Sequence, residues 1–183
     1  MNSKRIAGAV VGIVKSVQDD SGQGRILLEF PHLPGAPVSA MAPVAAPLAG
    51  KNRGAFYMPE IEDEVLVCFD QGNINHPYVI GYLWNGVDKP PETDPKNRIF
   101  LSPGGNTLRF EDGDNVKKVI LQSNSGHKIV LDDSSSADSI TIQTKGNLSV
   151  TLSDAQSSIT LSGGGRMITM SSGSRLPNPL NTP

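Results

Sequence analysis

Ser139–Ser162 reads SITIQTKGNLSVTLSDAQSSITLS, and this stretch decides the fold of the C-terminal half. It contains three apolar–x–apolar triplets separated by polar and glycine-containing segments. Alternation with a period of two is typical of a β-strand that has one dry face. The same triplet recurs about every ten residues from Ile99 to Met170. A fixed short period indicates stacked repeats, so the sequence predicts a rod of short strands.

The repeat comprises eight triplets, and every outer position is apolar. The pairs are Ile99/Leu101, Leu108/Phe110, Val119/Leu121, Ile129/Leu131, Ile140/Ile142, Val150/Leu152, Ile159/Leu161 and Ile168/Met170. The residue between the two apolar positions varies in the first four triplets and is threonine in the last four. In order these residues are Phe100, Arg109, Ile120, Val130, Thr141, Thr151, Thr160 and Thr169. Because threonine suits both strands and water, we expect these eight positions to face outward.

The composition changes near residue 90, which indicates two domains. No proline lies between Pro103 and Pro177, whereas the only Trp, the only Cys and all three Tyr precede residue 90. The segment 86–97, GVDKPPETDPKN, contains three prolines that favour a stiff connector. We therefore predict an N-terminal domain at 1–86, a linker at 87–97, a shaft at 98–173 and a Pro-rich tail at 174–183.

Charge and cysteine content exclude several classes. Sixteen Lys and Arg against eighteen Asp and Glu give a net charge of −2, and no basic stretch favours nucleic-acid binding. A single cysteine excludes an intrachain disulfide, and Cys68 lies in an apolar run that predicts a buried, inert thiol. The apolar run Ile6–Val14 follows Lys4–Arg5 but is too short and lacks a convincing cleavage site, so we expect a first strand and no signal peptide.

The N-terminal domain has the pattern of a small β-barrel. Five strand-like stretches are separated by Gly, Asn, Asp and Pro turns. They are Ala9–Val17, Arg25–Phe30, Ser39–Pro43, Glu64–Phe69 and Tyr78–Leu83. Five short strands in this length predict a Greek-key barrel, for which the OB-fold is the common solution. The excess of acidic residues in this half argues against single-stranded nucleic acid as its ligand.

Several motifs of this domain resemble one family in order and spacing. They are GRILLEFP (24–31), PEIEDEVLVCF (59–69), Gly72, His76-Pro77, GYLWN (81–85) and Pro90-Pro91. In this combination they resemble the OB-fold of phage baseplate assembly protein V and of VgrG, the spike of type VI secretion and related contractile injection systems. The repeat at 98–173 is then similar to the triangular β-prism that follows the OB-fold in that family.

The chain also departs from family patterns. VgrG proteins carry a hub domain ahead of the OB-fold, whereas the match here begins near Met1, so we expect the hub to be a separate chain. The short linker leaves no room for the lysozyme domain that some phage spikes insert there. No His-x-His pair is present near the end for the iron that some spike tips bind, so we expect no metal or other cofactor.

The resemblance predicts an obligate homotrimer whose shaft is an intertwined triangular β-helix. We expect each strand to pair with strands of the other two chains, because a lone chain would expose costly strand edges. The sixteen apolar triplet residues named above would then form the trimer core. A PAAR-type protein would sit on the tip and contact Ile168, Met170 and Leu176.

No motif predicts catalysis. His32, His76 and His127 are scattered, and no nucleophile elbow or zinc spacing is present. The acidic cluster Glu60, Glu62, Asp63 and Glu64 is interpreted as a solvated turn at a strand start rather than an acid–base pair. Asp132-Asp133 is interpreted as a solvated corner, and the stretch 104–114 lacks the spacing of a calcium repeat. We therefore expect no enzymatic activity.

The sequence thus predicts an all-β, membrane-puncturing central spike of a contractile injection system. It would dock on a separate hub through the OB-fold, carry a PAAR-type tip and meet the target membrane transiently. Assembly is expected in the bacterial cytoplasm, within a phage tail-like particle. An alternative is a structural stalk or adhesin of a tail fibre or surface appendage, although the shaft has only Phe100 and Phe110 as aromatic residues. A β-helical polysaccharide-degrading enzyme would need a wide carboxylate-lined groove that eight short strands cannot build.

Overall fold

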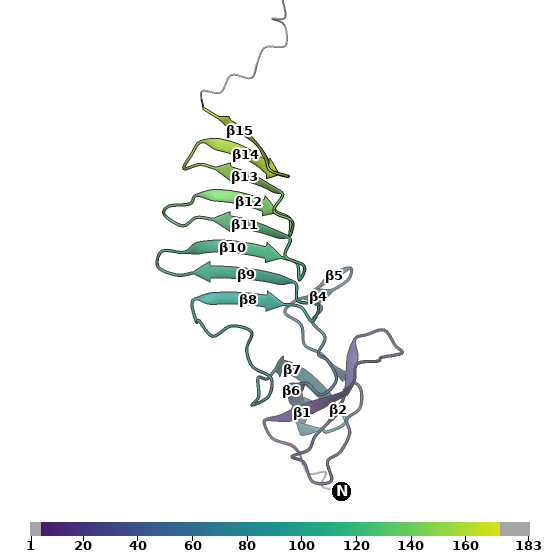
Figure 1. Ribbon diagram of the computed structural model, residues 1–183. Coiled ribbons are helices and arrows are strands. Elements are labelled where there is room, and N and C mark those ends of the chain that lie inside the picture. The colour runs from purple at the N-terminus through teal and green to yellow at the C-terminus, as the bar shows by residue number, and fades with distance from the viewer. Residues whose placement is uncertain (1–4, 173–183) are drawn as a thin grey trace, which may run out of the picture. The chain divides into compact units, whose positions relative to one another are not determined.

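The computed structural model describes residues 5–172, which form β-strands and one short 3-10 helix, η1 (Asp70–Gly72) (Figure 1). The chain divides into two compact units, Met1–Lys89 and Pro90–Pro183. This division falls inside the segment that the sequence predicted as a linker. The predicted all-β class is confirmed. Within residues 5–172, no helix has the length and apolar character needed to cross a membrane.

The N-terminal unit is a five-stranded antiparallel sheet that curls into a nearly closed barrel. Its strands are β1 (Ala9–Ser16), β2 (Arg25–Glu29), β3 (Ala42–Pro43), β6 (Glu64–Phe69) and β7 (Pro77–Tyr82), in the order β3-β2-β1-β6-β7. The two edge strands approach each other, because Val44 forms a parallel bridge with Val79 and the Ala45 N–H donates to the Val79 carbonyl at 2.8 Å. The predicted five-stranded barrel is therefore confirmed.

The barrel contains its own hydrophobic core. Nine apolar residues are buried: Val14, Ile26, Leu28, Phe30, Ala42, Val65, Val67, Phe69 and Val79. The Phe30 and Phe69 rings meet edge to face with centroids 5.3 Å apart. Gly12 on β1 makes room for this pair, since a Cβ there would lie 3.2 Å from the Phe30 ring and 3.3 Å from Val67.

The turn between β1 and β2 is held by one carboxylate. Asp19 accepts hydrogen bonds from the backbone N–H groups of Ser21, Gln23 and Arg25, and its side chain is only 4% exposed. The Arg25 guanidinium also donates to it at 3.0 and 3.2 Å. The Arg25 side chain is the chief reason that the pKa of Asp19 lies far below its usual range.

One hairpin of this unit was not predicted as strands. The strands β4 (Ala49–Gly50) and β5 (Arg53–Gly54) pair only with each other, around Lys51 and Asn52. The sequence indicated a turn at Gly50-Lys51-Asn52 but gave no apolar alternation on either side of it, because every strand position of this hairpin is exposed.

The C-terminal unit is a single antiparallel sheet of eight strands. They are β8 (Asn97–Leu101), β9 (Thr107–Asp112), β10 (Lys117–Gln122), β11 (Lys128–Asp132), β12 (Ser139–Gln143), β13 (Ser149–Ser153), β14 (Ser158–Gly163) and β15 (Arg166–Ser171). Each strand pairs with its neighbours in sequence, and the spatial order from β15 to β8 is unbroken (Figure 1). All eight triplets therefore lie on strands.

This pairing corrects one expectation. The sequence predicted that each shaft strand would pair with strands of two other chains, whereas the ladders lie within one chain. The physical reason is that short turns bring the chain directly back beside itself, so successive strands satisfy each other's backbone groups. The edges that remain within residues 90–172 belong to β8 and β15.

Candidate functional site: an open apolar sheet face

Two columns of apolar side chains run the length of the C-terminal sheet on one face. Directly paired residues of an antiparallel sheet share a face, so the register identifies both columns. The first is Phe110, Val119, Leu131, Ile140, Leu152, Ile159 and Met170. The second is Leu108, Leu121, Ile129, Ile142, Val150, Leu161 and Ile168. Fourteen of the sixteen predicted core residues therefore share this apolar face.

The apolar face is uncovered in a single chain. Among residues 90–172 no apolar side chain is buried, and the buried polar residue is Ser134 at a corner. Leu131, Ile140, Leu152 and Ile159 are each more than 40% exposed although they lie mid-sheet. A contiguous apolar face of this length marks a surface that contacts a partner.

On the first strand, β8, the residues that lie on the apolar face are not the predicted ones. Phe100 pairs with Leu108 and Arg98 pairs with Phe110, so these two residues lie on the apolar face. Ile99 pairs with Arg109 and Leu101 with Thr107, which places both on the opposite face. The assignment of Ile99 and Leu101 to the same face as the other fourteen is therefore wrong. Three consecutive apolar residues fit either frame, and the ladder selects the one centred on Phe100.

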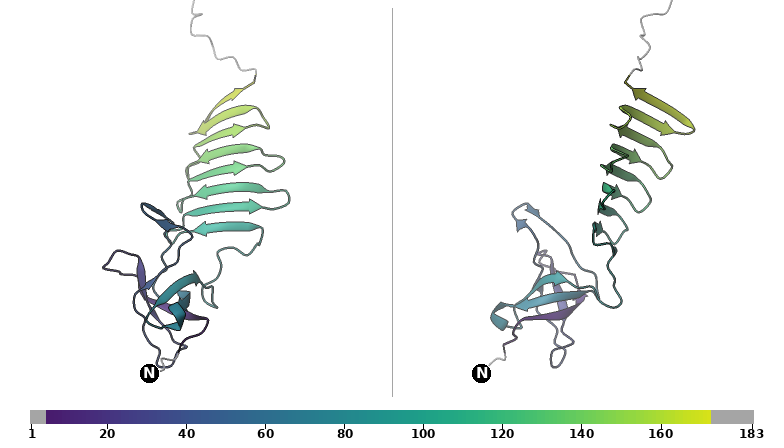
Figure 2. Two further views of the ribbon diagram at one scale, coloured as in Figure 1. Left: turned by 180° about the vertical axis from the view of Figure 1, so that it is seen from behind. Right: turned by 90° about the vertical axis from the view of Figure 1, so that its left-hand side faces the viewer.

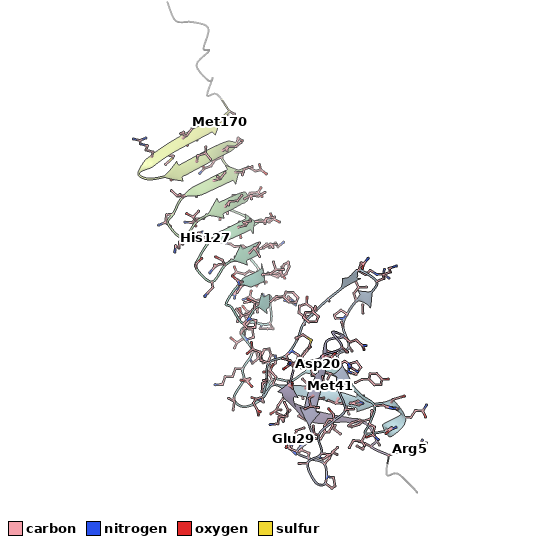
Figure 3. The ribbon with its side chains drawn as sticks, turned by 90° about the vertical axis from the view of Figure 1, so that its right-hand side faces the viewer. Arg5, Asp20, Glu29, Met41, His127 and Met170 are labelled. Atoms are coloured by element: carbon pink, nitrogen blue, oxygen red, sulfur yellow. The ribbon has the colours of Figure 1, made fainter. Side chains whose placement is uncertain are left out.

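The opposite face is mixed on its first strands and becomes rich in Ser and Thr from β12 onward. Its central column runs Ile99, Arg109, Ile120, Val130, Thr141, Thr151, Thr160 and Thr169, so the seven positions after β8 face as predicted. Ion pairs flank the column near β9 to β11, where Arg109 contacts Glu111 at 2.8 Å and Lys118 contacts Asp132 at 2.9 Å. From β12 onward the charges give way to Ser and Thr, and the Thr160 and Thr169 hydroxyls lie 3.3 Å apart. Figure 3 shows side chains projecting from both faces of this sheet.

The segment ahead of β8 is fixed to the sheet. Arg109 on β9 contacts the Glu92 carboxylate at 2.7 Å, and that carboxylate accepts hydrogen bonds from the Thr93 and Asp94 N–H groups and from the Asn97 amide. These bonds, led by the one from the Asp94 N–H, lower the pKa of Glu92 to about 2. Sequence reasoning predicted a stiff connector from its prolines and missed this attachment, because Glu92 and Arg109 are far apart along the chain.

Three turns along one edge of the sheet share one construction. The Ser102, Ser123 and Thr144 hydroxyls each accept the N–H of the residue four positions later, at 3.0 to 3.1 Å. The residue three positions later has a positive φ in each turn: Gly105, Gly126 and Asn147. Gly and Asn adopt this conformation most readily. The turns recur every 21 residues, which is the two-strand period of the sheet.

The structure describes two of the three residues that were predicted to contact a tip protein. Ile168 and Met170 lie on β15, the last strand of the sheet, and are 63% and 49% exposed (Figure 3). Leu176 and the tail at 174–183 lie outside the described residues. The structure thus presents two exposed apolar side chains at the end of the sheet where the tip partner was predicted.

The described residues contain no constellation that suggests catalysis. No group of three or more His, Cys, Asp or Glu within residues 5–172 is arranged to hold a metal ion. His32, His76 and His127 are exposed and lie on separate turns. The acidic cluster forms a tight turn in which Asp63 accepts the Glu60 N–H at 2.8 Å and Glu62 contacts Lys15 at 3.0 Å. Cys68 is partly exposed rather than buried, as its strand partner is Tyr78 on the outer surface.

The sequence of the barrel matches a known family of domains. Residues 10–84 match the family model described as the type VI secretion system/phage-baseplate injector OB domain. The matched range runs from β1 to just beyond β7, so it covers the whole five-stranded barrel. The barrel is therefore similar in sequence to the injector OB domain over its whole length.

The chain also resembles a curated spike protein. It is 32% identical over 89 residues to the type VI secretion system spike protein VgrG5 of Pseudomonas aeruginosa strain PAO1. The alignment covers 44% of this chain and 11% of that protein, so the chain spans about a tenth of the length of this relative. The predicted resemblance to VgrG-like spike proteins is confirmed.

Proposed function

We propose that this chain is the non-enzymatic, membrane-puncturing central spike of a contractile injection system, and that it acts as a homotrimer. The observation that supports this most strongly is the uncovered apolar face on a chain whose barrel is similar in sequence to the injector OB domain. Three copies of the sheet, each forming one side of a prism, would bring their apolar faces together around a common axis. Each chain would thereby acquire the hydrophobic core that its C-terminal unit lacks.

The burial available is large enough to make the trimer obligate. Fourteen side chains of each sheet are at most partly buried in one chain. Complete burial of an aliphatic side chain is worth about 2 kcal/mol, so finishing a half-complete burial at these positions contributes on the order of 10 kcal/mol per chain before association entropy.

The mechanism is mechanical. Every ladder of the shaft lies within one chain, so axial load would be shared by many backbone hydrogen bonds together with the central core. The outer face of Thr and Ser toward β15 is hydrophilic and nearly neutral, which suits passage through a tube and a membrane. The OB domain would dock on a separate hub chain, and a PAAR-type protein would cover the exposed Ile168 and Met170. Assembly in the bacterial cytoplasm into a phage tail-like particle is part of this proposal.

The mass of the full chain in solution is the decisive first experiment. Sedimentation equilibrium or native mass spectrometry should give three times the chain mass, and dilution to nanomolar concentration should not dissociate it. A monomer would contradict the proposed prism. Co-expression with the hub and the PAAR-type protein of the same apparatus should then yield one complex, whereas a stalk or adhesin would assemble without either of them.

A further inference from the structure

The hairpin formed by β4 and β5, together with its stem residues Leu48 and Ala55, projects from the barrel (Figure 2). We name residues 48–55 the arm. The Ala55 N–H donates to the Leu48 carbonyl at 2.8 Å, and the two strands pair with no other strand. A two-stranded hairpin of this length is marginally stable alone in water. We therefore expect the arm to be stabilised by contact with another surface.

The arm carries positive charge that no ion pair among the described residues neutralises. Lys51 and Arg53 are both exposed, and neither forms an ion pair among residues 5–172. The Arg53 guanidinium lies flat across Gly50, where an added Cβ would be 3.0 Å from its central carbon. The arm thus carries a planar cation and an ammonium within three residues, together with the half-exposed Leu48.

A surface of the opposite kind lies on the same barrel. We name Tyr57, Glu60, Asp63 and Tyr82 the acidic–aromatic patch. The Tyr82 hydroxyl donates to the Tyr57 carbonyl, and Asp63 accepts the Glu60 N–H, so the two tyrosines and the acidic turn are each tied together. Burial, with the negative charge of Asp63 as the second cause, raises the pKa of Tyr82.

The patch is suited to cations. Tyr57 and Tyr82 are about half exposed, and the side chains of Glu60 and Asp63 form no ion pair within residues 5–172. The nearest basic residue of the turn, Lys15, is already shared between Glu29 and Glu62 at 3.1 and 3.0 Å. Carboxylates beside aromatic rings attract Lys and Arg through both charge and cation–π contacts.

No ion pair joins the arm to the patch among residues 5–172. Only Ala55 and Phe56 separate the end of β5 from Tyr57 in the sequence, and the arm projects from the barrel (Figure 2). Each chain therefore offers one cationic arm and one acidic–aromatic patch at different places on one domain. Such a pair makes a head-to-tail contact, and head-to-tail contacts that close produce rings.

We propose that the arm of one protomer docks on the acidic–aromatic patch of the next protomer, so that three barrels form a closed ring. This inference rests on the homotrimer of the proposed function and assigns the contact between its OB domains. The ring holds the three barrels together independently of the apolar core of the sheets. The partner is thus a second copy of this chain.

A zero-length cross-link on the unmodified full chain tests the contact. A carbodiimide joins a lysine amine to a carboxylate only when the two touch. Trimers assembled from mixed ¹⁵N-labelled and unlabelled chains should yield Lys51–Glu60 or Lys51–Asp63 peptides that combine both isotopes. The Lys51→Arg variant is the matched control, because it keeps the charge and removes the reactive amine, and it should lose the link while remaining trimeric.

A charge swap gives a second readout. Arg53→Glu and Glu60→Lys should each speed amide exchange of residues 48–55 by about tenfold, and the double variant should recover most of the protection. Lys89→Glu makes the same charge change outside the arm and should leave that exchange unchanged. A trimer in which the link is absent or joins residues of one chain overturns this inference alone, as does an arm that gains protection only when a hub protein is added. A monomeric chain overturns the proposed function as well.

Discussion

The two units of this protein are both antiparallel and both built from short strands, yet they treat their apolar residues in opposite ways. The barrel buries nine apolar side chains, eight of them with no exposed surface, whereas the eight-stranded sheet buries none among residues 90–172. The barrel curls so that its inward faces meet across a core, and its edges β3 and β7 join. The sheet is one layer. A closed sheet can be complete as a single chain, and an open layer with an apolar face needs other layers.

The largest effect is expected from a charge placed in the middle of the open face. Ile140→Asp should convert the proposed trimer to monomers, because a carboxylate in an apolar core loses its hydration without gaining a partner. Sedimentation of the full chain would measure this. The barrel of the same variant should stay folded, since its core lies entirely within residues 14–79.

The neighbouring position provides the control. Thr141 lies on the opposite face of the same strand, so Thr141→Asp adds the same charge one residue away. This variant should remain trimeric. If both variants dissociate, or neither does, the apolar face is not the surface that joins the chains.

A substitution in the barrel core should have the reverse effect: it should destabilise the barrel and leave the trimer intact. Phe30→Ala removes a fully buried ring that packs against Phe69 and should lower the free energy of unfolding of the barrel by about 3–5 kcal/mol. Urea denaturation followed by Trp84 fluorescence would report it. The mass of the assembly should not change, because this core contributes nothing to the sheet. Dissociation caused by Phe30→Ala would show that the two units do not fold independently.

Two substitutions on β8 test which of its residues lie on the apolar face, and their expected effects are smaller. Phe100→Glu should weaken the trimer by about 1–2 kcal/mol, because Phe100 lies on the apolar face at the edge of the sheet. Ile99→Glu should shift stability by no more than about 0.5 kcal/mol, as Ile99 faces Arg109. The midpoint of guanidinium-induced dissociation would rank the two variants. The opposite ranking would restore the frame in which Ile99 and Leu101 are the core residues.

The smallest effect concerns pH at the start of the sheet. The pKa of Glu92 is lowered from 4.5 to about 2, so its ionised form stabilises the folded state. That contribution is complete above about pH 4.5 and is lost as the pH falls toward 2. Glu92→Gln should flatten the acid limb of a stability–pH profile measured by urea denaturation, whereas Asp154→Asn at an exposed turn should not. An unchanged acid limb in Glu92→Gln would exclude this carboxylate as its source.

The sequence predicted most of the strands because their signals are local. The period-two triplets placed all eight strands of the sheet, and the alternation in Glu64–Phe69 placed the inner strand β6 of the barrel. The frame of β8 was missed because Ile99, Phe100 and Leu101 are all apolar. A longer period of 21 residues indicates which of the three lies on the apolar face. Residues 21 apart along that face are Phe100, Leu121 and Ile142, and likewise Leu108, Ile129 and Val150. If the repeat unit is two strands rather than one, Phe100 is the residue of β8 that belongs on the apolar face.

Other features had no sequence signal. The ion pair between Arg109 and Glu92 and the clamp of Arg25 on Asp19 depend on which polar residues the turns bring together. The hairpin at β4 and β5 lacks apolar alternation, and all four of its strand positions are exposed. The acidic–aromatic patch combines Tyr82 with residues 57–63, which are about 20 residues away in the sequence. Long-range polar contacts of this kind follow from the fold rather than from periodicity.

By itself the sequence determined that this protein is all β, that its apolar residues divide into a barrel and a repeat, and that the repeat has one dry face. These properties follow from local alternation and turn chemistry, which depend on residues near each other in the chain. Only the tertiary structure decided which strands pair, which frame β8 adopts and that the dry face stays open in one chain. Pairing and register depend on where turns return the backbone, and a one-residue shift exchanges the two faces without altering the composition of the strand.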